Sequence, residues 1–177
     1  MAPFPVILGV DPGTGITGYG VVARENGRIH LLECGVIRTR TGAPLPARIR
    51  TIYEGVVALV DRHTPTVMSV EAVFQGKNVR SALVLGHARG AILLAAALRD
   101  VEIAEYSPRE IKKAVVGNGN ATKDQVGFMV QERLRLKSPP TPADAADGVA
   151  AALCHFVLGM DGRISGVLAH RFAPGSP

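Results

Sequence analysis

The sequence predicts an α/β domain in which three antiparallel strands open the sheet and two later strands alternate with helices. In the first third of the chain, short runs rich in Val, Ile and Leu alternate with turn signals. Further along, strand-like runs are separated by segments with helical periodicity. At 177 residues, of which 47% are hydrophobic, the chain is long enough for one compact domain and too short for two of full size.

Strands are predicted at about 5–10, 18–24 and 29–37. A Gly-rich turn, DPGTGITG, joins the first two, and Asn26-Gly27, a strong hairpin signal, joins the second pair. A helix follows over about 47–62, where apolar residues recur at helical spacing. Because short links join the three strands, we expect them to form an antiparallel meander that opens the sheet.

The remaining segments alternate in type. A buried strand is predicted at 67–72, a helix over 79–98 and a short strand at 101–106. The motif Ser107-Pro108 with Glu110 has the pattern of an N-cap, a first-turn proline and an early acid, which predicts another helix. Two further helices are predicted at about 122–135 and 143–158, separated by prolines. We expect one folded domain over residues 1–159 and a flexible tail over 160–177, where the periodicity is lost.

Composition narrows the class of protein. The 20 Lys and Arg against 15 Asp and Glu give a formal charge of +5, which permits a polyanionic partner without requiring one. Cys34 and Cys154 lie far apart and lack a metal-type spacing, which indicates a reducing compartment. The longest apolar run, residues 91–98, is less than half of the roughly 20 residues that a membrane span needs. We therefore expect a soluble, cytoplasmic protein.

Four acids are candidates for chemistry. Asp11 ends the first strand, where a carboxylate either faces a ligand at the sheet edge or caps the following turn. Glu71 ends a buried strand, so it must be paired, hydrogen-bonded or metal-bound. Asp144 and Asp147 share one face of the predicted first turn of the last helix, where either the helix dipole or a shared cation would offset their repulsion. If the fold brings the four together, they supply the oxygen ligands that two divalent cations need for phosphodiester hydrolysis.

Three segments carry a resemblance to a known family: GVDPGTGITGYGVV at 9–22, VEAVFQGKNVRSALVLGHARG at 70–90 and PADAADGVAAALCH at 142–155. They closely resemble the RuvC family of Holliday-junction resolvases, in the same order and with similar separations. The resemblance covers about residues 6–157. It implies a ribonuclease H-like fold, with a five-stranded mixed sheet whose first three strands are antiparallel and whose faces are flanked by helices.

The resemblance also implies an activity and its partners. Members are Mg²⁺-dependent endodeoxyribonucleases that act as homodimers and resolve four-way junctions by paired symmetric nicks in homologous recombination and DNA repair. Metal-activated water attacks the phosphate, and two Mg²⁺ ions per subunit are implied, with Mn²⁺ as a substitute that suits the same oxygen ligands. The branch-migration proteins RuvA and RuvB are implied partners. The implied catalytic and metal-binding set is Asp11, Glu71, Asp144 and Asp147.

Five further residues match DNA-contacting positions of the family. Phe74 lies in a polar loop and resembles a wedge that stacks against bases near the crossover. Lys112 and Lys123 match lysines that contact backbone phosphates, and Asn78 and Arg80 are weaker candidates of the same kind. Without the resemblance, the plain alternatives are a core aromatic and solvated surface side chains.

Some alternatives stay open at this stage. Gly86 and Gly90 give a small-residue face that fits either packing on the sheet or a dimer contact, and His155 fits a core histidine. The main rival class is a phosphate-binding ATPase of the actin and Hsp70 type, whose first strand also ends in Asp before a Gly-rich turn. A ribonuclease or simpler resolvase on the same fold is a second rival. A non-catalytic junction-binding protein is disfavoured, because four acids repel phosphate when no metal is bound.

Overall fold

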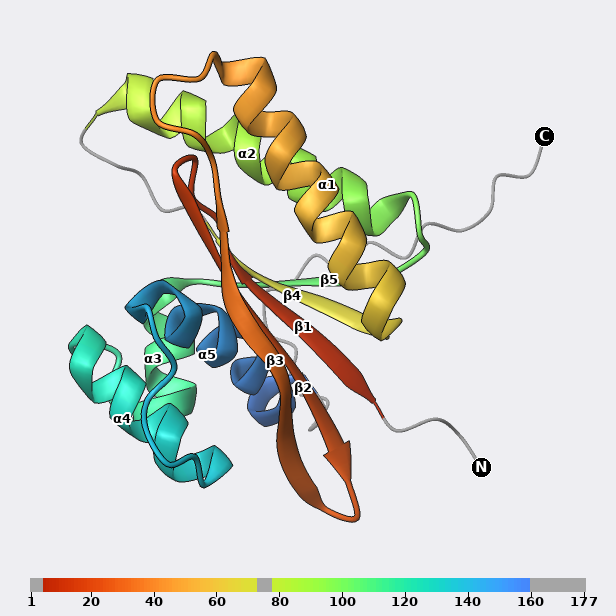
Figure 1. The fold of residues 1–177 in the computed structure, drawn as a ribbon. Helices are drawn as coiled ribbons and strands as arrows, with labels where there is room; N and C mark the ends of the chain where they lie inside the picture. The colour runs from red at the N-terminus through yellow and green to blue at the C-terminus, as the bar shows by residue number, and fades with distance from the viewer. Residues whose placement is uncertain (1–4, 73–77, 160–177) are drawn as a thin grey trace.

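The computed structural model describes residues 5–72 and 78–159 (Figure 1). Five strands form one sheet in the order β3-β2-β1-β4-β5. The strands β1 (Val6–Asp11), β2 (Ile16–Glu25) and β3 (Arg28–Arg38) are antiparallel, whereas β4 (Val67–Glu71) and β5 (Glu102–Tyr106) run parallel to β1. This confirms the predicted mixed sheet. The predicted tail, residues 160–177, lies outside the described residues.

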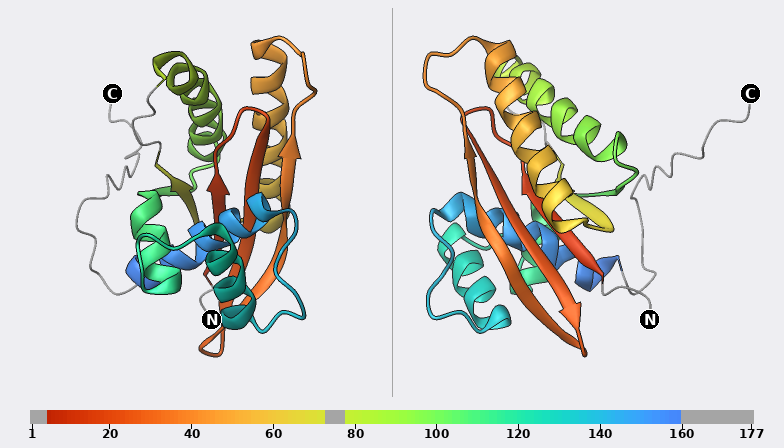
Figure 2. Two further views of the ribbon diagram at one scale, coloured as in Figure 1. Left: turned by 90° about the vertical axis from the view of Figure 1, so that its left-hand side faces the viewer. Right: turned by 45° about the vertical axis from the view of Figure 1, so that its right-hand side comes forward.

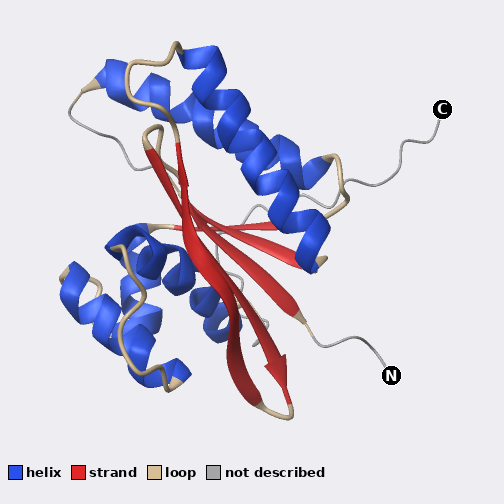
Figure 3. Ribbon diagram, viewed as in Figure 1, coloured by secondary structure: helices blue, strands red, loops and turns tan. Residues whose placement is uncertain are grey.

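The helices form two layers, one on each face of the sheet (Figures 1 and 3). One layer contains α1 (Leu45–His63) and α2 (Val79–Ala97). The other contains α3 (Pro108–Val116), α4 (Lys123–Leu134) and α5 (Ala143–Leu158), which Figure 2 shows on the opposite side. Side chains alternate along β1, so Ile7 packs in the core under α3, α4 and α5, and Leu8 packs under α1 and α2.

Local signals explain where the helices begin. The Ser107 hydroxyl accepts a hydrogen bond from the Glu110 backbone, and the Glu110 carboxylate accepts one from Ser107, which confirms the predicted start of α3. Thr122 and Gln125 form the same reciprocal pair at α4. The Asn26-Gly27 hairpin turn is also confirmed.

The helix α5 packs on β1 and β2 at very close range, because glycines face it. A Cβ atom at Gly18 would overlap the backbone carbonyl of Asp144, and one at Gly9 would overlap that of Gly148. Gly148 in turn lies against the backbone of Tyr19. Most residues of α5 are buried, so this helix is both core and the support of two candidate acids.

The helix α2 has two apolar faces. Ala88, Ile92 and Ala96 are buried on the sheet side, whereas Val79 and Leu83 are exposed. A Cβ atom at Gly86 or Gly90 would meet open space, so packing on the sheet is excluded for this glycine pair. By length and composition alone, α2 is the one helix among residues 5–72 and 78–159 that is long and apolar enough to cross a membrane, and 28% of its most apolar 18-residue stretch is buried. The apolar character of α2 therefore covers more of the chain than the uninterrupted apolar run at 91–98.

Candidate metal centre

Three acids far apart in the sequence meet at one end of the sheet. Asp11 ends β1, and Asp144 and Asp147 lie on α5, which the glycine contacts hold directly above β1 and β2. Carboxylate oxygens of the three lie within 4.8 Å of one another. Asp144 lies in the first turn of α5, but Asp147 lies beyond that turn. The prediction that the first turn holds both acids was therefore wrong. The helix dipole therefore favours Asp144 more than Asp147, because its effect fades within one turn.

Glu71 approaches the same place from the neighbouring strand. It ends β4, which pairs with β1, and it lines a cleft of about 170 Å³ together with Asp11 and Asp147. It does not belong to the group of three whose oxygens lie within 4.8 Å. The remaining cleft walls are apolar or basic: Pro108, Ile111, Lys112, Lys123, Val126 and Ala150.

The cleft is unfavourable for negative charge. Burial, followed by the charges of Glu71 and Asp147, raises the pKa of Asp11 to about 7. Burial and the charge of Asp147 raise the pKa of Glu71 to about 6. Carboxylates gathered in a poorly hydrated cleft need a positive partner to remain ionised.

Lys123 supplies one positive charge to this group. Its Nζ lies 2.8 Å from an oxygen of Asp147 and 3.7 Å from one of Asp144, and the hydrogen bond to Asp147 raises the pKa of Lys123. The ammonium group of Lys123 thus lies at a position where the carboxylates of Asp144 and Asp147 attract a cation. Because the converging donors are all carboxylate oxygens, they fit a hard divalent cation.

The turn after Asp11 is held by residues that sequence analysis missed. The Thr17 hydroxyl donates to the Gly13 carbonyl at 2.7 Å. The Thr39 hydroxyl and Arg48 Nε donate to the Thr14 carbonyl at 2.8 and 3.0 Å. These contacts fix the turn without the Asp11 carboxylate, which favours the ligand-facing alternative for Asp11. The available signal was a hydroxyl residue closing a Gly-rich turn.

The other candidate residues lie in different settings. Lys112 is partly buried and lines the cleft from α3, whereas Arg80 is exposed on α2. The Asn78 side chain accepts a hydrogen bond from the Ser81 backbone at 3.2 Å and so caps α2. Phe74 lies outside the described residues. His155 is a core histidine as expected, buried and 2.9 Å from the Tyr106 hydroxyl.

Replacing Asp11 with Asn is expected to stabilise the protein at pH 8 in the presence of a chelator. The folded state raises the pKa of Asp11 from 3.8 to about 7, so folding binds a proton and stability falls as the pH rises through this window. At pH 8, above both pKa values, this rise in pKa corresponds to a gain of about 4 kcal/mol for the variant, and near pH 4 most of this gain should be lost. Urea unfolding at several pH values measures this difference. A gain that does not depend on pH would contradict the electrostatic explanation.

Comparisons with known proteins give a consistent result. The profile of a family described as crossover junction endodeoxyribonuclease RuvC matches residues 7–155. A RuvC from Pelotomaculum thermopropionicum is 47% identical over 150 residues, covering 85% of this chain and 92% of that protein. One from Hydrogenovibrio crunogenus is 49% identical over 168 residues, covering 91% and 94%. A structure of Thermus thermophilus RuvC in complex with Holliday junction substrate superposes with a TM-score of 0.84 at 34% identity, covering 90% and 97% of the two chains.

Proposed function

Because the chain belongs to the RuvC family of crossover junction endodeoxyribonucleases, we propose that it resolves four-way DNA junctions by paired symmetric nicks during recombination and repair. The observation that carries this proposal is the gathering of Asp11, Asp144 and Asp147, with Glu71 in the same cleft. These are the four acids that the resemblance implies. Their convergence depends on the fold, because they come from two strands and a distant helix.

We propose that the four acids bind two Mg²⁺ ions, for which Mn²⁺ would substitute. Bound there, the ions would activate water for attack on the phosphate and stabilise the leaving oxygen. Asp11 lies between β4 and α5, which suits a carboxylate shared by both ions, whereas Glu71 approaches from β4 and Asp144 and Asp147 from α5. The apolar walls of the cleft keep these carboxylates poorly hydrated, which strengthens their attraction for cations.

Lys112 and Lys123 flank the cleft, and we propose that they contact backbone phosphates. Substituting either with Ala should reduce the salt dependence of junction binding by about one unit of slope, because one fewer counterion is released. Fluorescence anisotropy with a labelled junction over a NaCl titration measures the slope. Lys113→Ala is the matched control, because Lys113 neighbours Lys112 on α3 but does not line the cleft. An equal slope change in the control would contradict specific roles for the two lysines.

We propose that the protein is a homodimer whose subunits meet through the outward face of α2. Val79, Leu83, Gly86, Gly90 and Leu94 recur at helical spacing on this exposed face. We also propose that the protein is soluble and cytoplasmic, and a partner covering this face would then account for the apolar character of α2. Leu83→Asp should then give a folded monomer by light scattering. Leu32→Asp, at an exposed leucine on β3, should stay dimeric.

Family membership also supports RuvA and RuvB as partners in branch migration. A single assay tests the central proposal: incubation with a four-way junction, a matched duplex, an RNA–DNA hybrid and ATP, with and without Mg²⁺. Paired symmetric nicks in the junction alone, only when metal is present, are expected. Hydrolysis of ATP would favour the actin-like rival, and cleavage of the hybrid would favour a ribonuclease.

A further inference from the structure

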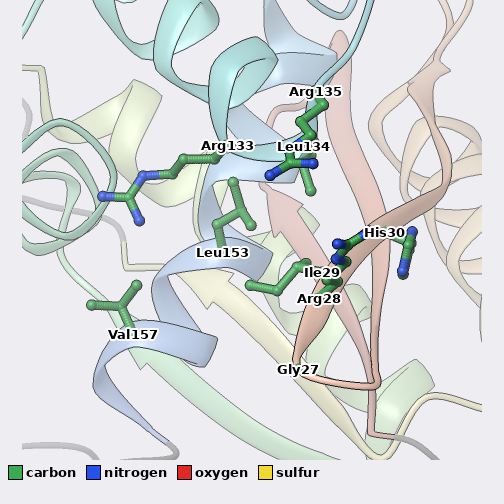
Figure 4. Close-up of a pocket in the computed structure, with 9 residues that line it drawn as sticks. All are labelled: Gly27, Arg28, Ile29, His30, Arg133, Leu134, Arg135, Leu153 and Val157. Carbon is green, nitrogen blue, oxygen red and sulfur yellow. The ribbon is translucent and has the colours of Figure 1, made fainter.

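A second pocket lies on the same side of the sheet as the metal centre but at the opposite end. It has a volume of about 410 Å³ and is formed by the β2–β3 hairpin, the end of α4 and the last turns of α5 (Figure 4). The residues that line it are Gly27, Arg28, Ile29, His30, Arg133, Leu134, Arg135, Leu153 and Val157.

The floor of this pocket is apolar and its rim is basic. Leu153 is 2% exposed, and Ile29, Leu134 and Val157 pack against the same core, so the floor is the edge of that core. In Figure 4, Leu153 lies between Arg133 and the side chains of the hairpin, and Val157 lies on the side away from His30. The rim consists of exposed basic residues, and none of the lining residues is acidic. A ligand approaching the pocket therefore meets positive charge first. The rim residues are Arg28, His30, Arg133 and Arg135.

Two of the rim arginines are available for a ligand. Arg133 donates from Nε to the Val115 carbonyl at 2.9 Å and from Nη2 to the Ala114 carbonyl at 3.1 Å, so it is occupied at the end of α3. Among residues 5–72 and 78–159, Arg28 and Arg135 have no side-chain hydrogen bond or ion pair. Arg135 also follows the last residue of α4 with a φ of 53°, a left-handed conformation that usually favours glycine.

The helix α4 connects this pocket to the metal centre. It begins at Lys123, which contacts Asp147, and Arg135 follows its last residue about 18 Å away at 1.5 Å per residue. Along β2, Gly18 pairs with Asp11, and Gly27 lies beyond the end of the strand about 30 Å away. At 3.4 Å per nucleotide along one strand, these lengths correspond to about five to nine base pairs of duplex.

We propose that Arg28 and Arg135 bind backbone phosphates of a junction arm about five to nine base pairs from the cleaved phosphate. This inference rests on the proposed junction-resolving function and adds a contact outside its active site. Guanidinium groups match phosphate oxygens with two parallel hydrogen bonds. A polyanion that continued from the cleft along α4 would reach the rim, because α4 begins at the cleft and ends at the pocket. An acidic protein segment fits less well, because the apolar floor it would use is already packed into the core.

The test combines a protein change with a DNA change. The double variant Arg28→Ala/Arg135→Ala, called the rim variant, is compared with the double variant Arg50→Ala/Arg62→Ala, called the α1 variant. The α1 variant loses the same charge from α1, on the other face of the sheet. Each protein is titrated with an unmodified junction, with one carrying neutral methylphosphonates about five to nine base pairs from the cut site, and with one carrying them near the arm ends. The rim variant should bind the unmodified junction about tenfold more weakly, with a salt slope smaller by about two.

The interaction between the two changes decides the outcome. Neutral phosphates at the proposed position should weaken binding by the unmodified protein and by the α1 variant, but not by the rim variant. Methylphosphonates near the arm ends should affect all three proteins equally. The proposal is overturned if the rim variant binds the unmodified junction as tightly as the unmodified protein does. It is also overturned if neutral phosphates at the proposed position weaken junction binding equally for the rim variant and the unmodified protein. Either result would favour an acidic protein partner for the pocket. Failure of the proposed function is distinct, because it would appear as absence of Mg²⁺-dependent nicking by the unmodified protein.

Discussion

Asp11→Asn should abolish junction cleavage while junction binding is retained. Asp11 ends β1 within 4.8 Å of oxygens of both α5 acids, and the amide keeps its shape but loses the charge that holds a cation. A loss of roughly thousandfold in the nicking rate is expected, which corresponds to about 4 kcal/mol of transition-state stabilisation. Glu71→Gln should behave in the same direction, because Glu71 lines the same cleft.

Single-turnover cleavage of a labelled junction and anisotropy binding measure the two effects separately. The control is Asp124→Asn, at an exposed acid in the first turn of α4 that does not line the cleft. It should cleave at the unmodified rate. Unmodified rates in Asp11→Asn would remove this residue from the catalytic set, and lost binding would indicate a structural role instead.

Gly18→Ala should damage both stability and cleavage, although it adds a single methyl group. That group would overlap the Asp144 carbonyl, which is backbone, so α5 must move away from β2. Overpacking of this kind costs about 1–3 kcal/mol. Because α5 carries Asp144 and Asp147, the displacement also separates them from Asp11, and we expect cleavage to fall by about a hundredfold.

Gly15→Ala is the matched control for this prediction. Gly15 lies in the same β1–β2 turn, and a Cβ atom there would meet nothing within 4 Å. Denaturant unfolding and single-turnover cleavage should leave it close to the unmodified protein. If both variants lose cleavage equally, turn chemistry rather than the position of α5 explains the effect.

Most of the fold was predictable because its local signals agree. The strand limits were placed to within two residues, and the cap at Ser107 located α3. The helix predicted over 47–62 begins earlier, at Leu45, because Pro46 is tolerated in a first turn. The equivalent cap at Thr122 and Gln125 has a signal in the sequence as well, the pattern Thr-x-x-Gln at the start of α4.

The arrangement of the site was less predictable, because it depends on contacts between distant segments. Sequence spacing placed Asp144 and Asp147 on one helix face but did not reveal that glycines bring α5 against β2. Nor did it show that Lys123 would reach Asp147, since α4 and α5 are separate helices. The rim arginines lie on a hairpin and a helix end, where each alone looks like an ordinary surface residue.

The position of α5 late in the sequence determines when the four acids can first come together during synthesis. A chain emerging from the ribosome makes β1 early, but Asp144 and Asp147 arrive only after the other described helices and strands. Residues 143–158 then close contacts with β1 and β2 across more than a hundred residues of sequence, and such non-local pairing is a late, slow event in folding. A nascent or truncated chain that lacks this helix has at most half of its four acids. Cutting activity is thereby withheld until α5 has folded against β1 and β2.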